Sequence, residues 1–216
     1  MRILYLARHG KVDFPDGVTR CIGRTEVPLS EEGRNQAREL CRYFSEHPVD
    51  HIYSSPMGRC VETADMIADG RMPVKIEEGL SEIYMGEWEN RPLKVLHKGL
   101  EPEPEYGEGR AAALRRFEQA VGRILNETKG NVLCVAHAGI NCCFLSKVLG
   151  TPLETSRALP QPYGGISRIL VGECGDMKAE EIGMAPVREH EAEYYKEDIE
   201  NEINSDGRSG GPCALP

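Results

Sequence analysis

The chain has 216 residues, of which 40% are hydrophobic and 28% charged, and its formal net charge at pH 7 is −9. This length and composition suit one globular domain, or a domain with an appendage, that can bury a sizeable core. The acidic balance argues against nucleic-acid binding, which needs clustered bases, and no apolar run approaches the ~18 residues that cross a bilayer.

The cysteines and the start of the chain indicate the compartment. The eight cysteines include no C-x-x-C pair, and most fall inside helix or strand patterns. They are therefore interpreted as buried, reduced thiols rather than as a disulfide framework or a zinc site. The opening MRILYLARHG has a very short apolar run and no small-residue cleavage site, unlike a signal peptide. We expect a cytoplasmic protein.

In chain order, the first predicted element is a nearly continuous apolar strand over residues 2–7, of the kind buried on both faces of a sheet. A long loop follows, and Ser30 is the predicted N-cap of the first helix. Residues 50–55 read as a short strand. Ser55 and Pro56 are the predicted N-cap and first residue of the next helix.

A third strand is predicted over residues 73–78. Residues 79–108 then show no sustained period, many Gly and Pro, and the only Trp. Long irregular segments inside compact domains are usually functional, so we interpret 79–108 as an insertion, or lid, over the active-site edge of the sheet.

The remaining elements complete an α/β pattern. The next predicted elements are a helix that Gly130 closes, a strongly apolar strand from Asn131 and a helix over 140–149. Residues 165–183 read as a hairpin at the edge of the sheet. Strands separated by helices predict an α/β fold with a mostly parallel central sheet.

The composition changes near the end of the chain. Residues 1–187 are predicted to form the folded domain, and residues 188–216 an acidic, partly disordered tail, since charged and small residues replace the apolar periodicity there.

Basic side chains follow three of the predicted strands. Arg8 and His9 end the first strand, Ser55 ends the second with Arg59 close behind, and His137 ends the strand from Asn131. Ligands bind outside the carboxyl ends of such strands, so these groups are expected to meet. Two arginines, two histidines and a helix N-terminus make an anion pocket, and tetrahedral phosphate has enough oxygens for all of these donors.

Five motifs occur in a characteristic order: RHG at 8–10, RCIGRTEVPLSEEGRNQA at 20–37, YSSPMGRCVETA at 53–64, LSEIYMGEWEN at 80–90 and AHAG at 136–139. With them the chain resembles the histidine phosphatase superfamily (phosphoglycerate-mutase-like, branch 1). In size and motifs it is nearest to alpha-ribazole phosphatase and other small phosphomonoesterases. The resemblance covers about residues 2–170 and implies a three-layer αβα sandwich.

The resemblance also implies a metal-independent phosphoryl transfer. His9 would form a phosphohistidine, while Arg8, Arg59 and His137 would hold the phosphoryl oxygens. Glu82 matches the family's general acid, which protonates the leaving oxygen and then activates water.

The acids near Glu82 and the histidines outside the motifs need separate interpretations. Glu87 and Glu89 lie close to Glu82 in the same motif, and the alternative is that one of these acids is only a solvated loop charge. The histidines outside the motifs are given structural roles, with substrate contact as an alternative for His97 alone: His47, His51, His97 and His190.

The predicted substrate-binding residues, besides those that hold the phosphoryl group, are Ile22, Gly23, Lys11, Arg20 and Arg24. Ile22 and Gly23 match the family's substrate loop. The three bases would either read a second anionic group or remain solvated loop charges.

The chain departs from the family pattern just after RHG. Lys11, Val12 and Pro15 stand where relatives commonly carry Glu or Gln, Ser or Thr, and Asn. These positions are expected at the mouth of the substrate site, so the departure leaves the catalytic chemistry intact and the identity of the substrate open.

A phosphatase acting on a small phosphorylated metabolite is favoured over a cofactor-dependent phosphoglycerate mutase. The region before the AHAG strand is short and holds EPEPEYGEG, whose acids would repel a second phosphate. A mutase must also shield its phosphohistidine from water. The mutase and a non-catalytic phospho-ligand binding protein remain the alternatives. No nucleic-acid or membrane partner is expected, and a homodimer stays open.

Overall fold

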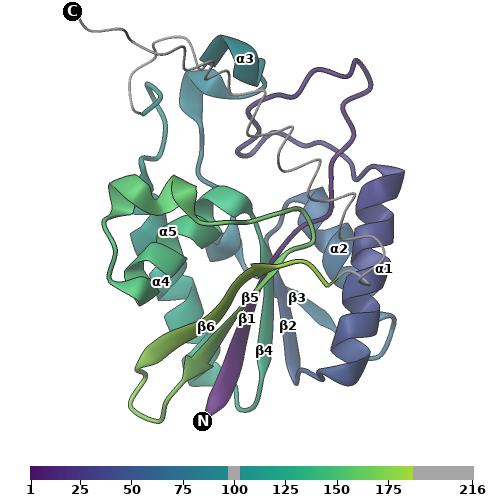
Figure 1. Ribbon diagram of the computed structural model, residues 1–216, viewed down its shortest axis with the longest axis vertical. Helices are drawn as coiled ribbons and strands as arrows, with labels where there is room; N and C mark the ends of the chain where they lie inside the picture. The colour runs from purple at the N-terminus through teal and green to yellow at the C-terminus, as the bar shows by residue number, and fades with distance from the viewer. Residues whose placement is uncertain (97–102, 187–216) are drawn as a thin grey trace, which may run out of the picture. The chain divides into compact units, whose positions relative to one another are not determined.

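The computed structural model describes residues 1–96 and 103–186, and its centre is a six-stranded sheet of order β3-β2-β4-β1-β5-β6 (Figure 1). β1 and β2 pair in parallel with β4, and β3 in parallel with β2. β5 runs antiparallel to β1 and forms the edge hairpin with β6. The strands are β1 Arg2–Arg8, β2 His51–Ser54, β3 Val74–Ile76, β4 Val132–Ala136, β5 Ile166–Val171 and β6 Met177–Met184.

Helices cover both faces of this sheet, which confirms the predicted three-layer α/β fold. They are α1 Glu31–Glu46, α2 Gly58–Ala68, α3 Leu93–Leu96, α4 Arg110–Glu127 and α5 Ala138–Leu149. Single turns of 3₁₀-helix occur at Glu78–Leu80 and Gly86–Trp88, with a longer one at Leu153–Ala158. None of the helices in the described ranges has the length and apolar character needed to span a membrane.

The apolar run of β1 is explained by burial on both sides. Side chains alternate between the two faces of a strand. Leu4 and Leu6 pack in the cluster that holds the buried faces of α4 and α5, whereas Tyr5 and Ala7 pack in the cluster of α1 and α2. A central strand between two helical layers therefore has no solvent-facing position for a polar residue.

The start of α2 differs from the prediction. The helix begins at Gly58, with Met57 as its N-cap, rather than at Pro56. Ser55 instead continues the pairing of β2 with β4, because its N–H donates to the Val135 carbonyl at 3.0 Å, and its Oγ lies 2.8 Å from His137 Nε2. The Glu26 carboxylate, distant in sequence, accepts from the Gly58 N–H at 3.1 Å and does the capping instead.

The predicted insertion packs on the loop that follows β1. The Cys21 N–H donates to the Arg91 carbonyl at 2.9 Å, and the Asn90 N–H donates to the Cys21 carbonyl at 2.7 Å. Trp88 is buried in a small apolar cluster with Cys21 and Leu96. The two segments therefore hold each other beyond the carboxyl end of β1.

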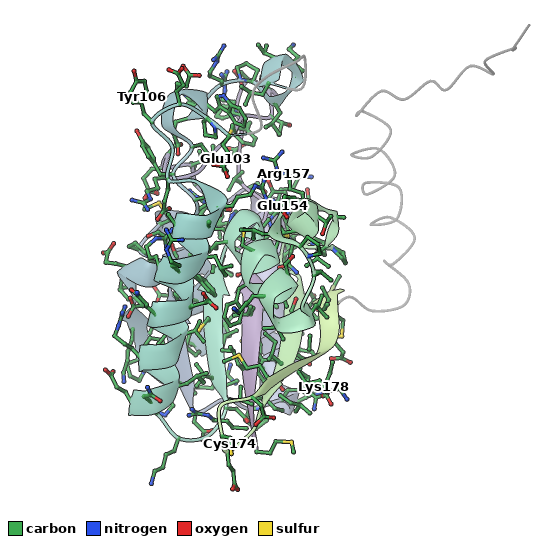
Figure 2. All side chains as sticks on the ribbon, turned by 90° about the vertical axis from the view of Figure 1, so that its left-hand side faces the viewer. Glu103, Tyr106, Glu154, Arg157, Cys174 and Lys178 are labelled. Carbon is green, nitrogen blue, oxygen red and sulfur yellow. The ribbon has the colours of Figure 1, made fainter. Side chains whose placement is uncertain are left out.

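Figure 2 shows this end of the domain and the opposite one. Glu103 and Tyr106, from the insertion, lie at one end, and Cys174, at the turn between β5 and β6, lies at the other. Residues 97–102 of the insertion, the expected boundary at 187 and the tail 188–216 lie outside the described residues, as do His97 and His190.

Candidate active site

The carboxyl ends of β1, β2 and β4 bring the predicted anion-binding residues together. The His9 N–H donates to the Ala136 carbonyl at 3.1 Å, so the residue after β1 lies beside the end of β4. The rings of His9 and His137 are 5.2 Å apart between centroids and meet edge to face. Both side chains are buried.

Arg59, in the first turn of α2, joins the two histidines. Its Nε donates to His9 Nε2 at 3.3 Å, and its Nη2 lies 3.2 Å from His137 Nδ1. The Arg59 side chain is only 1% exposed. A guanidinium is always charged, and burying a charge is costly unless polar groups compensate. Such a buried cation beside two histidines attracts an anion.

These contacts determine which nitrogen of each histidine carries the proton. His9 Nδ1 lies 2.8 Å from the Gly10 carbonyl, which can only accept, so Nδ1 bears the hydrogen and Nε2 presents a lone pair. His137 Nδ1 faces the Arg59 donor, so its Nε2 donates to Ser55 Oγ at 2.8 Å. His9 Nε2 therefore presents its lone pair beside a fixed cation, as a nucleophile would need.

Both imidazoles are held neutral. Burial lowers the pKa of His9 well below its ordinary value, and the positive charges of Arg8 and Arg59 lower it further. Burial is also the largest cause that lowers the pKa of His137, followed by Arg59. A lone pair on His9 is thus available at neutral pH.

Arg8 is held by a segment that sequence reasoning missed. Its Nη1 donates to the Gln161 carbonyl at 2.6 Å, and the guanidinium carbon lies 3.5 Å from the centre of the Tyr163 ring. Arg8 Nε is buried and has no hydrogen-bond partner in the described part of the chain. The free donor suits an incoming anion.

The signal for Tyr163 and Gln161 is weak in the sequence. They occur in PQPYGG, just before β5, where prolines and glycines indicate only a turn. The structure pairs this segment with the end of β1, because the Arg8 N–H donates to the Gly165 carbonyl at 2.9 Å.

Glu82 lies where α5 begins. The carboxylate, 6% exposed, accepts from three backbone N–H groups at 2.9 Å each: those of Ile83, Gly139 and Ile140. Burial nevertheless raises the pKa of this carboxyl, in opposition to those hydrogen bonds and to Arg59. A carboxyl with a raised pKa suits a proton donor. A Cβ at Gly139 would lie 2.8 Å from Glu82 Oε1, so glycine is required for this approach.

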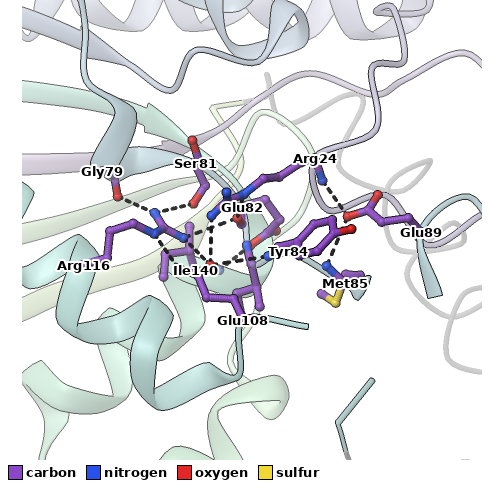
Figure 3. A network of polar contacts seen from close by, with 11 residues as sticks. Arg24, Gly79, Ser81, Glu82, Tyr84, Met85, Glu89, Glu108, Arg116 and Ile140 are labelled. Carbon is purple, nitrogen blue, oxygen red and sulfur yellow. Dashed lines mark hydrogen bonds and ion pairs between the residues drawn. The ribbon is translucent and has the colours of Figure 1, made fainter. Parts of the chain in front are cut away.

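Arg116 supports Glu82 from the other side (Figure 3). It donates to the carbonyls of Gly79, Ser81 and Glu82, at 2.7, 3.0 and 3.4 Å. Its Nε and Nη2 also bind the two oxygens of Glu108, each at 2.7 Å. A bidentate pair of this kind fixes the guanidinium, and with it the backbone that carries Glu82.

Among the predicted substrate-loop residues, Gly23 is brought to the site. Its carbonyl accepts from Arg59 Nη2 at 2.8 Å. Ile22 is half-buried in the same loop.

The three predicted substrate-binding bases have protein partners. Lys11 Nζ lies 2.7 Å from Glu32, and Arg24 Nη2 lies 3.2 Å from Glu108. Arg20 pairs with Asp16. Lys11 and Arg20 each pair with one nearby acid, whereas Arg24 shares Glu108 with Arg116.

Val12 was expected at the substrate mouth, but it is buried, and its backbone forms an isolated antiparallel bridge with Leu29. Across the described ranges, His, Cys, Asp and Glu side chains form no group of three or more that could hold a metal ion.

Comparisons with known proteins agree with this geometry. A family model described as the histidine phosphatase superfamily (branch 1) matches residues 4–180. A Yersinia pestis (strain Pestoides F) protein described as "Probable phosphoglycerate mutase GpmB" is 32% identical over 181 residues, which cover 77% of this chain and 83% of that protein.

Two solved structures illustrate the shared fold. Bacillus stearothermophilus YhfR is 28% identical with a TM-score of 0.76, covering 84% of this chain and 96% of its own. The alpha-ribazole phosphatase from Shigella flexneri is 24% identical with a TM-score of 0.73, covering 86% of this chain and 98% of its own. At the latter identity the likeness concerns the fold alone.

Proposed function

The chain belongs to the histidine phosphatase superfamily (branch 1), and we propose that it is a metal-independent phosphomonoesterase that acts on a small phosphorylated metabolite through a phosphohistidine at His9. The observation that carries the proposal is the lone pair of His9 Nε2, presented in a buried site 3.3 Å from Arg59 Nε. We also propose a cytoplasmic location, which the buried free thiols of Cys60, Cys134 and Cys143 support.

In the first step, His9 Nε2 attacks phosphorus and the P–O bond to the leaving group breaks. When the phosphoryl group binds, the Arg59 Nε–H turns from His9 to a phosphoryl oxygen, and the His137 Nε2–H turns from Ser55 Oγ to another. Arg8 Nε donates to the third. Glu82 gives its proton to the leaving oxygen, because an alkoxide is too basic to leave unprotonated.

In the second step, the Glu82 carboxylate takes a proton from water, whose oxygen attacks phosphorus. The N–P bond breaks, its electron pair returns to His9 Nε2, and inorganic phosphate leaves. The enzyme is thereby restored, with Glu82 protonated again.

Two alternatives make different predictions. The resemblance to a protein described as a probable phosphoglycerate mutase is the reason to test that activity, and interconversion of 2- and 3-phosphoglycerate faster than phosphate release would favour it. A phospho-ligand binding protein would bind phosphate or vanadate tightly and hydrolyse no ester. Acidic residues such as Glu103 and Glu105 in the insertion favour a phosphatase, since they would repel a second phosphate.

Removal of divalent metals is expected to leave the activity unchanged. The proposed chemistry uses only arginine, histidine and glutamate side chains, so hydrolysis of p-nitrophenyl phosphate should proceed at the same rate in excess EDTA. Release of p-nitrophenol before and after chelation measures this. Complete loss in EDTA, restored by added metal, would favour a metal hydrolase that uses the same histidines.

The pH dependence of kcat/KM should show an acid limb well below pH 6.5, the ordinary pKa of histidine. His9 must be neutral to attack, and its lowered pKa keeps it neutral above that limb. The alkaline limb should reflect loss of the Glu82 proton, because Glu82 must be protonated to act as the acid and its pKa is raised above 4.5. The measured profile is corrected for ionisation of the phosphate group of the substrate, whose second pKa is about 6. A limb from His9 at or above pH 6.5 would contradict the assignment.

A further inference from the structure

Glu89, left undecided from the sequence, is the centre of a compact hydrogen-bond cluster. Its carboxylate accepts from the backbone N–H groups of Gly23, Arg24 and Thr25 at 3.2, 2.8 and 3.1 Å. The Thr25 hydroxyl and the Met85 N–H, the latter at 3.1 Å, donate to it as well. One carboxylate thus fixes three consecutive residues of the loop after β1.

The carbonyls of this same loop hold the Arg59 guanidinium. The Gly23 carbonyl accepts from Nη2 at 2.8 Å, and the Thr25 carbonyl accepts from Nη1 at 2.9 Å. In the described part of the chain, Arg59 forms no ion pair with a carboxylate, so these two carbonyls are its main anchors. Because these carbonyls engage Nη1 and Nη2, the Arg59 Nε–H is left directed at His9.

The contact between Glu89 and the loop is close-packed. A Cβ at Gly23 would lie 2.3 Å from Glu89 Oε1 and 2.3 Å from the Ile83 carbonyl oxygen. Only glycine permits this approach. Because Ile83 follows Glu82 directly, the loop at Gly23 packs against both Glu89 and the segment that carries Glu82.

Glu89 is a charged acceptor across the working pH range. Partial burial by itself raises its pKa, but hydrogen bonds from the Thr25 hydroxyl and from the N–H groups of Arg24, Met85 and Thr25 outweigh burial and lower the pKa below its ordinary value. Hydrogen bonds to an ionised acceptor are about twice as strong as neutral ones.

We propose that Glu89 is a positioning residue for Arg59: through the Gly23–Thr25 loop it sets the orientation of the guanidinium that holds the phosphoryl group against His9. This inference rests on the proposed function, because it assigns Glu89 to the same site. Glu89 acts through backbone groups and contacts neither the phosphoryl group nor the leaving group.

The test compares Glu89→Gln with Glu87→Gln, the same substitution two residues away at an exposed side chain. An amide keeps the shape but loses the charge and one acceptor atom. Small misplacements of catalytic groups cost up to ~10²-fold in rate, so kcat for p-nitrophenyl phosphate should fall by about 10- to 100-fold in Glu89→Gln and stay unchanged in Glu87→Gln. The affinity for orthovanadate, measured by calorimetry, should fall in parallel.

A double-mutant cycle separates positioning from general stabilisation. If Glu89 acts through Arg59, Glu89→Gln should have little further effect once Arg59→Ala has removed the guanidinium. An equal fold-loss in the wild-type and Arg59→Ala backgrounds would overturn the proposal. Equal kcat for Glu89→Gln and Glu87→Gln would overturn it too.

A second variant and a second measurement keep the proposal testable. Thr25→Val removes the hydroxyl donor to Glu89 and should lower kcat in the same direction, by less, and it replaces Glu89→Gln if that variant does not fold. If the wild-type protein hydrolyses no ester, the proposed function fails, and the vanadate affinities of the same variants decide the positioning role alone.

Discussion

Replacing His9 with alanine is expected to lower kcat for phosphate esters by roughly 10⁵- to 10⁶-fold, the scale of losing a covalent nucleophile. No other described group presents a lone pair beside Arg59 Nε as His9 Nε2 does. Arg8, Arg59 and His137 would still bind the phosphoryl group, so affinity for the substrate should change much less than kcat. Phosphate release in steady state, with binding of vanadate measured separately, checks both expectations.

The control is His47→Ala. His47 stacks on the ring of Tyr43 outside the site, at 4.1 Å between centroids, and its loss should leave the rate unchanged. Circular dichroism establishes that His9→Ala is folded. A folded His9→Ala protein that retains more than about a tenth of the wild-type rate would contradict the nucleophile assignment, because such a loss is far below the nucleophile scale.

Replacing Glu82 with glutamine is expected to lower the rate of the phosphorylation step by ~10²- to 10⁴-fold for alkyl phosphates, the usual contribution of a general acid. The loss should be much smaller for p-nitrophenyl phosphate, because p-nitrophenolate is a weak base that leaves without a proton. The difference between the two esters is the diagnostic quantity, since a simple packing defect would affect both equally. Single-turnover phosphorylation rates for both esters provide the measurement.

Glu87→Gln, exposed in the same segment, serves as the matched control and should leave both esters unaffected. An equal loss for alkyl and aryl esters in Glu82→Gln would mean that Glu82 acts by holding the start of α5, where it accepts from the Gly139 and Ile140 N–H groups, rather than by proton transfer.

Much of the fold was predictable because its layers impose a simple pattern. A strand covered by helices on both faces, such as β1, must be apolar between its ends. Ser30 caps α1 by accepting from the N–H of Gly33, three residues on. The start of α2 was predicted wrongly. Ser-Pro is a strong local capping signal, but tertiary pairing of Ser55 with β4 and capping of Gly58 by Glu26 overrode it.

The convergence of the candidate site was predictable for a related reason. The carboxyl ends of parallel strands lie at one edge of the sheet, so His9 and His137 meet although 127 residues lie between them in the sequence. Tyr163, Gln161 and Arg116 could not be found in this way. They act through backbone carbonyls or ring faces, and such contacts leave no residue-type pattern in the sequence.

The charges of the substrate loop show a further limit. Lys11, Arg20 and Arg24 are compatible with a second anion subsite or with solvated loop charges. In the structure Lys11 pairs with Glu32 and Arg24 with Glu108, both distant in sequence, whereas Arg20 pairs with Asp16 of the same loop. A count of bases near a motif carries no information about which acids fold onto them.

The most direct test of the central claim is to trap the intermediate. Wild-type protein is mixed with a ³²P-labelled phosphate ester in EDTA, quenched in alkali, in which a phosphoramidate survives, and digested for peptide mapping. We predict label on the peptide that contains His9, lost as inorganic phosphate during a chase with unlabelled ester and absent from His9→Ala. Turnover with label on another residue, or with no labelled protein at any time in single-turnover experiments, would contradict a phosphohistidine at His9.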